Sequence, residues 1–206
     1  MATKGNSDST ATIEMQAIGL ETVEIPIEGV TELIVHRWSA KAKKAMLDKQ
    51  MGVAKQKKEA KVPEEDYEDS MYRLDDGGYG FPATGFKAAI VGACRLYDDL
   101  PMTRAKMAIY VEGEMNQEGE VLVRIEATPR MREDMVRLQT GVADIRYRAG
   151  FPKWRATLKV TCVKRLLSVD QLINLVNAAG LGGIGEWRPS APKSATGSYG
   201  RFRVAL

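Results

Sequence analysis

Hydrophobic and polar positions alternate with two different periods along this chain, and the two periods predict both strands and helices. Apolar residues occupy every second position across 21–28, which is typical of a half-buried strand. Residues 33–38 form another apolar segment, which we interpret as the same strand after a kink. Because Pro26 has no backbone donor, we expect this strand to lie at a sheet edge or to contain a bulge.

The helical period occurs in two later segments. Residues 81–97 have apolar side chains three and four positions apart, and Thr84 stands where an N-cap is expected. A second amphipathic stretch follows Ser168, with Gln171 in the position that completes a capping box, and it stops at Gly180. These segments predict two helices that pack on a sheet.

Short apolar runs between and after these helices predict the remaining strands. Residues 106–113 and 120–127 flank a polar turn at 116–119 and are expected to form a hairpin. The clearest alternation in the chain lies in 154–166, and a last strand is expected at 202–206.

The order of these elements is βαββαβ, which predicts an α+β fold with a ferredoxin-like (RRM-like) core. Residues 1–20 are expected to be a mobile tail, and 21–206 a single domain. Two insertions interrupt the core. The first, 40–80, is expected to hold a basic helix (40–58) and a short acidic helix (63–70) and to form a separate lobe. In the second, 128–153, Met131, Met135 and Leu138 suit a helix, whereas 143–147 suits a short strand.

Composition agrees with a single domain. The 206 residues are 44% hydrophobic and 28% charged, which is enough apolar material for a core. The formal net charge is only +3. However, residues 124–206 contain 15 basic and 6 acidic side chains, a net of +9, and residues 1–123 have a net of −6. A polyanion is therefore expected to bind the C-terminal part.

Scarcity of metal ligands and nucleophile motifs excludes several classes of protein. The chain has one histidine, His36, and two cysteines, Cys94 and Cys162. This set cannot form a zinc finger, and no G-x-S-x-G motif accompanies the histidine, so we expect neither a metal nor a cofactor. The cysteines are expected to be reduced core thiols. With no apolar run of membrane-spanning length and no signal peptide, the protein is expected to be cytoplasmic.

A glycine-rich stretch near the C-terminus has the most informative chemistry. Glycines in 180–185 and 197–200 let backbone N–H groups approach an anion closely. No G-K-[ST] sequence follows a strand, so a Walker motif is absent. An ordinary flexible connection is the simpler interpretation of such a loop. Basic and aromatic neighbours nevertheless favour binding of a single nucleic-acid strand: Arg188, Lys193, Arg201, Arg203, Trp187, Tyr199 and Phe202.

Two segments resemble the repeat-associated mysterious proteins, or RAMP superfamily. They are FPATGFKAAIVGACR (81–95) and GGIGEWR (182–188) with GSYGRFR (197–203). In that family an I-P-G-S-S-L-K-G-like turn opens the first core helix, and a G-G-x-x-x-R-G-x-G-R-like loop precedes the last strand. The resemblance implies a relative of the RNA-binding backbone subunit of CRISPR effector complexes, or a phage or mobile-element protein of the same fold.

The resemblance and the charge distribution together give a set of candidate contacts. The expected nucleic-acid-binding residues are Arg37, Lys41, Lys43, Lys44, Thr84, Lys87, Arg146, Arg148, Arg155, Gly183, Gly185, Arg188, Lys193, Tyr199 and Arg201. In the family, an insertion forms a thumb that wedges between bases. The resemblance implies this role for 128–153, with Met131 or Met135 as the wedge, although simple packing is the more common role of such methionines.

These observations predict a protein that is not an enzyme and binds single-stranded RNA, such as a guide RNA, without base specificity. Copies are expected to assemble head to tail along the strand, with other effector-complex subunits as possible partners. Three alternatives stay open: a phage-type single-stranded DNA-binding or annealing protein, an endoribonuclease that uses His36, and a protein–protein adaptor.

Overall fold

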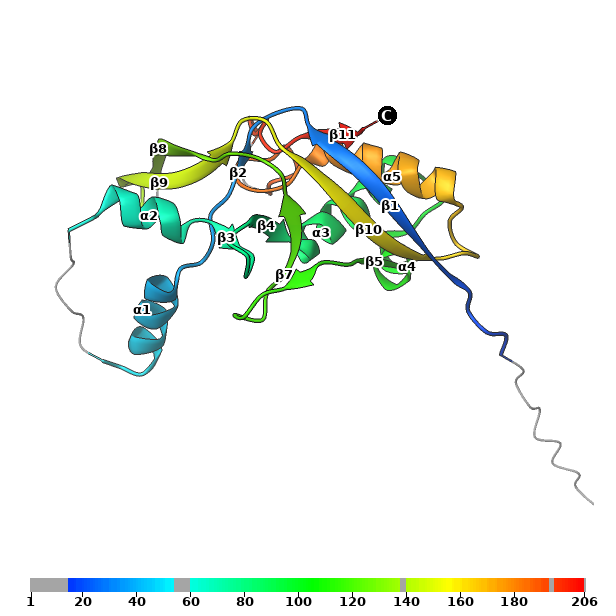
Figure 1. Ribbon diagram of the computed structural model, residues 1–206, viewed down its shortest axis with the longest axis horizontal. Coiled ribbons are helices and arrows are strands. Elements are labelled where there is room, and N and C mark those ends of the chain that lie inside the picture. Colours follow the sequence, from blue (N-terminus) through cyan, green and yellow to red (C-terminus); the bar gives the residue numbers. More distant parts are fainter. Residues whose placement is uncertain (1–14, 54–59, 138–139, 193–194, 206) are drawn as a thin grey trace, which may run out of the picture.

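The longest strands form one antiparallel sheet in the computed structural model, which describes residues 15–53, 60–137, 140–192 and 195–205. The strand order is β11-β1-β10-β5. Strands β1 and β10 lie side by side along most of their length (Figure 1) and place Leu20 opposite Val163. The four strands are β1 (Leu20–Gly29), β10 (Arg155–Val163), β5 (Ile109–Val111) and β11 (Phe202–Val204).

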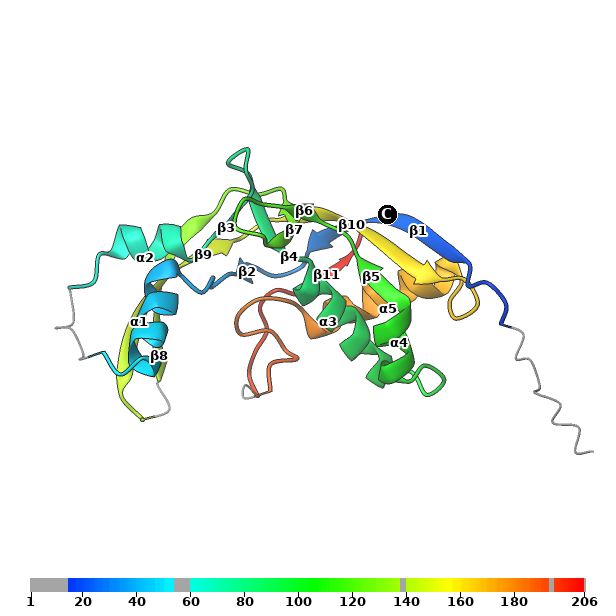
Figure 2. The ribbon, with the colours of Figure 1, turned by 90° about the horizontal axis from the view of Figure 1, so that it is seen from below.

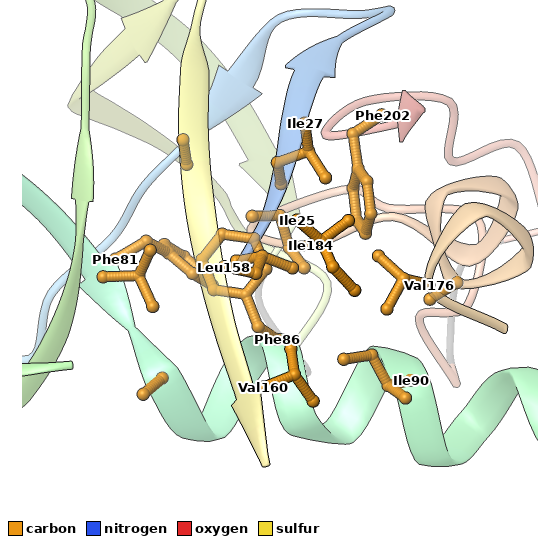
Figure 3. Close-up of a cluster of buried hydrophobic side chains, with 14 of the residues drawn as sticks. Ile25, Ile27, Phe81, Phe86, Ile90, Leu158, Val160, Val176, Ile184 and Phe202 are labelled. Carbon is orange, nitrogen blue, oxygen red and sulfur yellow. The ribbon is translucent and has the colours of Figure 1, made fainter. Parts of the chain in front are cut away.

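Helices cover one face of this sheet, as Figure 2 shows below β1 and β10. They are α3 (Ala83–Ala93), the short 3-10 helix η1 (Cys94–Leu96), α4 (Met102–Ala108) and α5 (Val169–Gly182). The core lies between the two layers (Figure 3), where the Phe202 ring stands edge-on to Phe86 and Trp154 at centroid distances of 6.2 and 6.0 Å. The α+β class is therefore confirmed.

Two smaller antiparallel sheets and two helices extend the molecule on the other side (Figure 1). One sheet has the order β2-β9-β8: β2 (Leu33–Ile34), β9 (Ala143–Phe151) and β8 (Arg130–Arg137). The other has the order β3-β4-β7-β6: β3 (Tyr72–Arg73), β4 (Tyr79–Pro82), β7 (Val121–Ile125) and β6 (Glu114–Met115). The helices are α1 (Ala40–Gln50) and α2 (Pro63–Asp69).

Pro26 belongs to a strand inside a four-stranded sheet. The expected edge position is nevertheless correct locally, because β11 does not extend along β1 as far as Pro26. Strand β11 pairs with β1 only from Ile27 to Gly29, and just beyond it the Ala205 N–H donates to the Pro26 carbonyl. Because both backbone groups of a strand residue point to the same side, the missing donor of Pro26 faces the point where β11 ends. Pro26 therefore disrupts no ladder.

The second insertion contains a hairpin, so the helix considered for Met131 and Met135 is wrong. Strands β8 and β9 pair from Arg130 opposite Gly150 to Arg137 opposite Ala143. Side chains at alternate positions of β8 therefore lie on opposite faces of the hairpin, which is the strand period rather than the helical one. Leu138, the third residue of the expected helix, lies outside the described residues.

Two expected strands also differ from the structure. Residues 33–34 are not a continuation of β1, since β2 pairs with β9 in a separate sheet. In 106–113, only Ile109–Val111 is a strand, and it pairs with β10 rather than with the segment after the turn. The apolar residues just before β5 belong to α4, whose Ala105 and Ala108 are buried. The turn at 116–119 does connect a hairpin, formed by β6 and β7.

Helix boundaries follow local capping chemistry in some places and not in others. The capping box is confirmed: the Ser168 hydroxyl accepts from the Gln171 N–H, and the Gln171 side chain accepts from the Ser168 N–H. Thr84 is not a cap, because α3 begins at Ala83 directly after β4. Ser39 caps α1, which ends at Gln50; residues 54–58 of the longer expected helix lie outside the described residues.

Candidate nucleic-acid interface

The two segments singled out in the sequence meet at one cleft. Its volume is about 710 Å³, and its opposite walls are α3 and the loop that follows α5. Figure 2 shows this loop, drawn in orange, beside α3. Small residues of α3 line one wall, namely Gly85, Ala88, Ala89 and Gly92, while residues 182–186 and 188–190 line the other. Residues almost a hundred positions apart in the chain thus form a single groove.

Glycines of this loop are required for packing against the rest of the chain. Gly183 and Gly185 have φ of 67° and 76°, a conformation that other residues rarely adopt. A Cβ on Gly185 would overlap with the Ile34 carbonyl oxygen of β2. The Gly183 N–H donates to the Ala179 carbonyl at 3.0 Å, so it is not available to a phosphate. The Gly183 N–H, which was expected to bind an anion, therefore caps the end of α5 instead.

Basic side chains at the loop differ in their availability. Arg188 lines the cleft and donates from Nη1 to the Gly185 carbonyl at 2.9 Å, which leaves its other nitrogens for a ligand. Arg201 is half-buried, and its backbone N–H donates to the Thr31 hydroxyl at 2.9 Å. Arg201 does not line the cleft, whereas Arg95 adds a second cation to its wall. Lys193 lies outside the described residues.

Arginines of the β8–β9 hairpin cover the aromatic rings that were expected to stack on bases. The Arg132 guanidinium lies 5.1 Å from the centre of the Tyr199 ring. Arg148 lies 4.6 Å from the centre of the Trp187 ring. Because these faces are occupied, Tyr199 is a contact between the loop and the hairpin in this structure.

Arg148 is buried, although the sequence suggested a phosphate contact. Its side chain is 1% exposed and pairs with Asp134 at 2.8 Å and Glu186 at 3.3 Å. Asp134 also pairs with Arg132 at 2.9 Å, and Arg132 contacts Glu32 in turn. The Arg148 Nε has no hydrogen-bond partner among the described residues. This network joins the hairpin to the glycine-rich loop, so Arg148 has a structural role here.

The candidate residues of 37–44 lie around a second cavity and on α1. Lys43 and Lys44 are exposed on α1, and Lys41 lines the second cavity. Arg37 is mostly buried and pairs with Glu120 at 3.2 Å and with Glu118. The Arg37 guanidinium is therefore paired with these two carboxylates rather than free to contact a phosphate.

At the start of α3, two candidates diverge. Thr84 is exposed, whereas the Lys87 ammonium lies 4.5 Å from the centre of the Tyr110 ring. Neither of them lines the cleft, which the neighbouring small residues of α3 form instead.

The open face of the central sheet carries paired charges. Arg155 is 73% exposed there but shares Glu28 with Arg203, at distances of 3.9 and 2.6 Å. Lys159 pairs with Glu112 at 2.7 Å. Acidic and basic groups therefore balance on this face, which makes it a poorer surface for a polyanion than the cleft on the helical side.

The two candidate wedge residues are exposed. Met131 and Met135 are 44% and 64% exposed and lie on one face of β8, and Ile145, 45% exposed, stands opposite Met135. Packing in the core of this chain therefore does not explain them. Arg146, on the other face of the hairpin, lies 3.9 Å from Asp144.

His36 lines both cavities and so stands where they meet. Partial burial of the imidazole, together with the charges of Arg146 and Arg148, lowers the pKa of His36 below its ordinary value of 6.5. The ring is therefore mainly neutral at physiological pH.

Three residues that the sequence did not single out contribute to these sites: Glu32, Asp134 and Trp38. In a strand, Asp134 lies on the same face as Arg130 and Arg132. This alternation of charged residues is the signal in the sequence that could have indicated an ion pair at Asp134. Among the described residues, no group of three or more His, Cys, Asp or Glu side chains is placed to hold a metal ion. Within the same ranges, no helix is long and apolar enough to cross a membrane.

Comparisons with known proteins find a likeness to solved structures but not to a family model or a curated protein. No family model matches, and no curated protein matches. Among solved structures, Cmr6 from Pyrococcus furiosus is similar, with 12% sequence identity and a TM-score of 0.41. The match covers 92% of this chain and 100% of that one. Such a distant likeness carries no functional argument, so any function has to be argued from the site itself.

Proposed function

We propose that the protein binds single-stranded RNA in the cleft between α3 and the glycine-rich loop. The observation that carries this proposal is that residues of 81–95 and of 182–188, which belong to the two motif segments, line the same groove. Small residues on α3 leave room for a sugar–phosphate backbone, and Arg95 and Arg188 supply positive charge along it. The opposite sheet face, with its paired charges, is a less suitable alternative.

We further propose that the core is ferredoxin-like and that the chain is a RAMP relative. The antiparallel order β11-β1-β10-β5, with α3 and α5 between successive strands, supports the first statement. The two motif segments on the cleft support the second. Head-to-tail assembly along RNA belongs to the same proposal, and the exposed Met131 and Met135 are its candidate wedges.

Binding to fluorescein-labelled 12-nucleotide RNA and DNA, measured by anisotropy from 50 to 500 mM salt, tests the function. Affinity should fall steeply with salt and be higher for RNA. Arg188→Ala should weaken binding by about 3- to 10-fold and reduce the logarithmic salt slope by about 0.7, the value for one phosphate on a single strand. Higher affinity for DNA would favour the annealing protein instead.

A steric variant distinguishes binding in the cleft from non-specific attraction of RNA to positive charge. A side chain at Gly92 points into open space, because a Cβ there meets no atom within 4 Å, and Gly92 lines the cleft. Gly92→Leu should therefore fold normally and abolish most binding without changing the charge. Arg155→Ala, which removes an exposed cation from the sheet face, is the matched control and should bind like wild type. Equal affinity of Gly92→Leu and wild type would refute the cleft.

A specific observation also supports a second candidate function, an endoribonuclease. The neutral imidazole of His36 is placed where both cavities meet, which suits a general base. We nevertheless propose a protein without catalytic activity. Incubation of wild type and His36→Ala with labelled RNA distinguishes the two, since cleavage by wild type that His36→Ala abolishes would establish the nuclease.

A further inference from the structure

A second, smaller cavity adjoins the cleft and has a different lining. Its volume is about 250 Å³, and it lies between the start of α1, the helix α2 and the strand β9. Trp38, Lys61, Asp66, Asp69 and Arg146 contribute to its walls. Because drug-sized ligands need roughly 300 Å³ or more, this cavity suits a smaller planar group such as one nucleobase.

Trp38 supplies a stacking surface in this cavity. Its side chain is 51% exposed, although an indole is usually covered in a folded domain. A tryptophan ring beside cationic side chains is a common platform for the bases of a single strand. The exposure of Trp38 is thus explained if a base covers the ring when the strand is bound.

Two carboxylates on the wall, Asp66 and Asp69, are not paired with a cation among the described residues. Among the described residues, the side chains of Asp66 and Asp69 make no hydrogen bond or ion pair; Asp69 is exposed, and half-buried Asp66 interacts electrostatically with His36. Asp144 in the same cavity, by contrast, accepts from Lys61 at 2.7 Å and lies 3.9 Å from Arg146. Asp69 is also the last residue of α2, where the end of a helix disfavours negative charge.

Carboxylates that make no ion pair, next to cations, match the edge of one base in particular. The Watson–Crick edge of guanine presents two adjacent donors, N1–H and the N2 amino group, beside the acceptor O6. A carboxylate accepts from both donors, and a lysine or arginine donates to O6. Adenine, cytosine and uracil do not present this pair of donors, so the lining distinguishes guanine from the other three.

We propose that this cavity binds a guanine base of the RNA strand held in the cleft, with Trp38 stacked on it and Asp66 or Asp69 accepting from its N1–H and N2–H groups. The proposal rests on the proposed function, because the strand reaches the cavity past His36, which lines both spaces. It adds base preference at one position to an otherwise unspecific grip on the backbone.

Competition binding between a 12-nucleotide uridine RNA and the same RNA with one central guanosine tests this. The guanosine RNA should bind about tenfold more tightly. Replacing guanosine by inosine, which lacks only the N2 amino group, should remove much of that preference. Asp66→Asn with Asp69→Asn should abolish it, whereas Trp38→Ala should weaken binding of both RNAs.

Glu64→Gln with Glu65→Gln, on the same helix but outside the cavity lining, is the matched control for lost negative charge and should keep the preference. Equal affinity for the uridine and guanosine RNAs would overturn this inference. If wild type binds both RNAs equally and Gly92→Leu still abolishes that binding, the proposed function stands without the guanine site. Absence of binding to either RNA would refute both.

Discussion

Asp134 holds two arginines where the β8–β9 hairpin meets the glycine-rich loop. Its carboxylate is 5% exposed and pairs with Arg148 at 2.8 Å and Arg132 at 2.9 Å. Without Asp134, buried Arg148 would keep only Glu186, at 3.3 Å, as a counter-charge, and a poorly compensated buried charge is strongly destabilising. The contribution of Asp134 is therefore to make the burial of Arg148 tolerable.

Asp134→Ala should destabilise the protein by about 3–5 kcal/mol, because Arg148 would lose its nearest counter-charge while staying buried. Urea unfolding followed by circular dichroism measures the change. Arg155→Ala, which breaks an exposed pair with Glu28, should change stability by less than about 1 kcal/mol. Similar losses in both variants would contradict this account.

His36 should titrate below its ordinary value, since burial and two nearby arginines lower its pKa. The unfolded chain then takes up the proton more readily than the folded one. Stability from the neutral ring is thus fully present above pH 6.5 and is lost as pH falls through the pKa of the folded state. An NMR titration of this single histidine should give a midpoint below 6.5, and Arg146→Ala should raise it. A wild-type midpoint at or above 6.5 would be incompatible with this environment.

The glycine-rich loop is an element whose shape depends on a few backbone positions. Gly200 has φ of 65°, and a Cβ there would overlap with the Ile184 carbonyl oxygen across the loop. Gly77 has a similar φ of 82°, but a Cβ there would meet nothing within 4 Å. Both positions thus require a positive φ, but only Gly200 also has no room for a Cβ.

Gly200→Ala should destabilise the protein by at least about 2 kcal/mol, and Gly77→Ala by about 1 kcal/mol, because only the first adds a clash to the unfavourable conformation. Thermal or urea unfolding measures both. The difference between the variants reports the packing of the loop against itself. Equal losses would mean that this packing is looser than the structure indicates.

Elements with a long, regular pattern were predictable, and short ones were not. Strands β1 and β10 and helix α5 bury every second or every third to fourth residue, so the sequence indicates them directly. Strand β2 has two residues and β5 three, which is too short for any period. Their partners, far along the chain, decide where they pair.

The distribution of charge shows the same limit for the whole molecule. Acidic residues of the N-terminal part pair with basic residues of the C-terminal part, as Glu32 does with Arg130 and Arg132, about a hundred positions away. Glu28 with Arg203 and Glu112 with Lys159 follow the same rule. The net charges of −6 and +9 along the chain are therefore partly cancelled by folding. Candidate contacts chosen by charge alone, such as Arg148 and Arg155, consequently lie outside the cleft.

Pro26 has a consequence for how copies of the protein meet. Beyond the end of β11, the first half of β1 presents a strand edge that no described strand covers, and such edges invite a second sheet to add on and aggregate. A proline where that edge begins cannot donate to an incoming strand, and Glu24 carries a charge on the exposed face of the same stretch. Both features disfavour the addition of a further strand at this edge of the central sheet. This edge therefore favours association of copies through side chains over association through backbone hydrogen bonds.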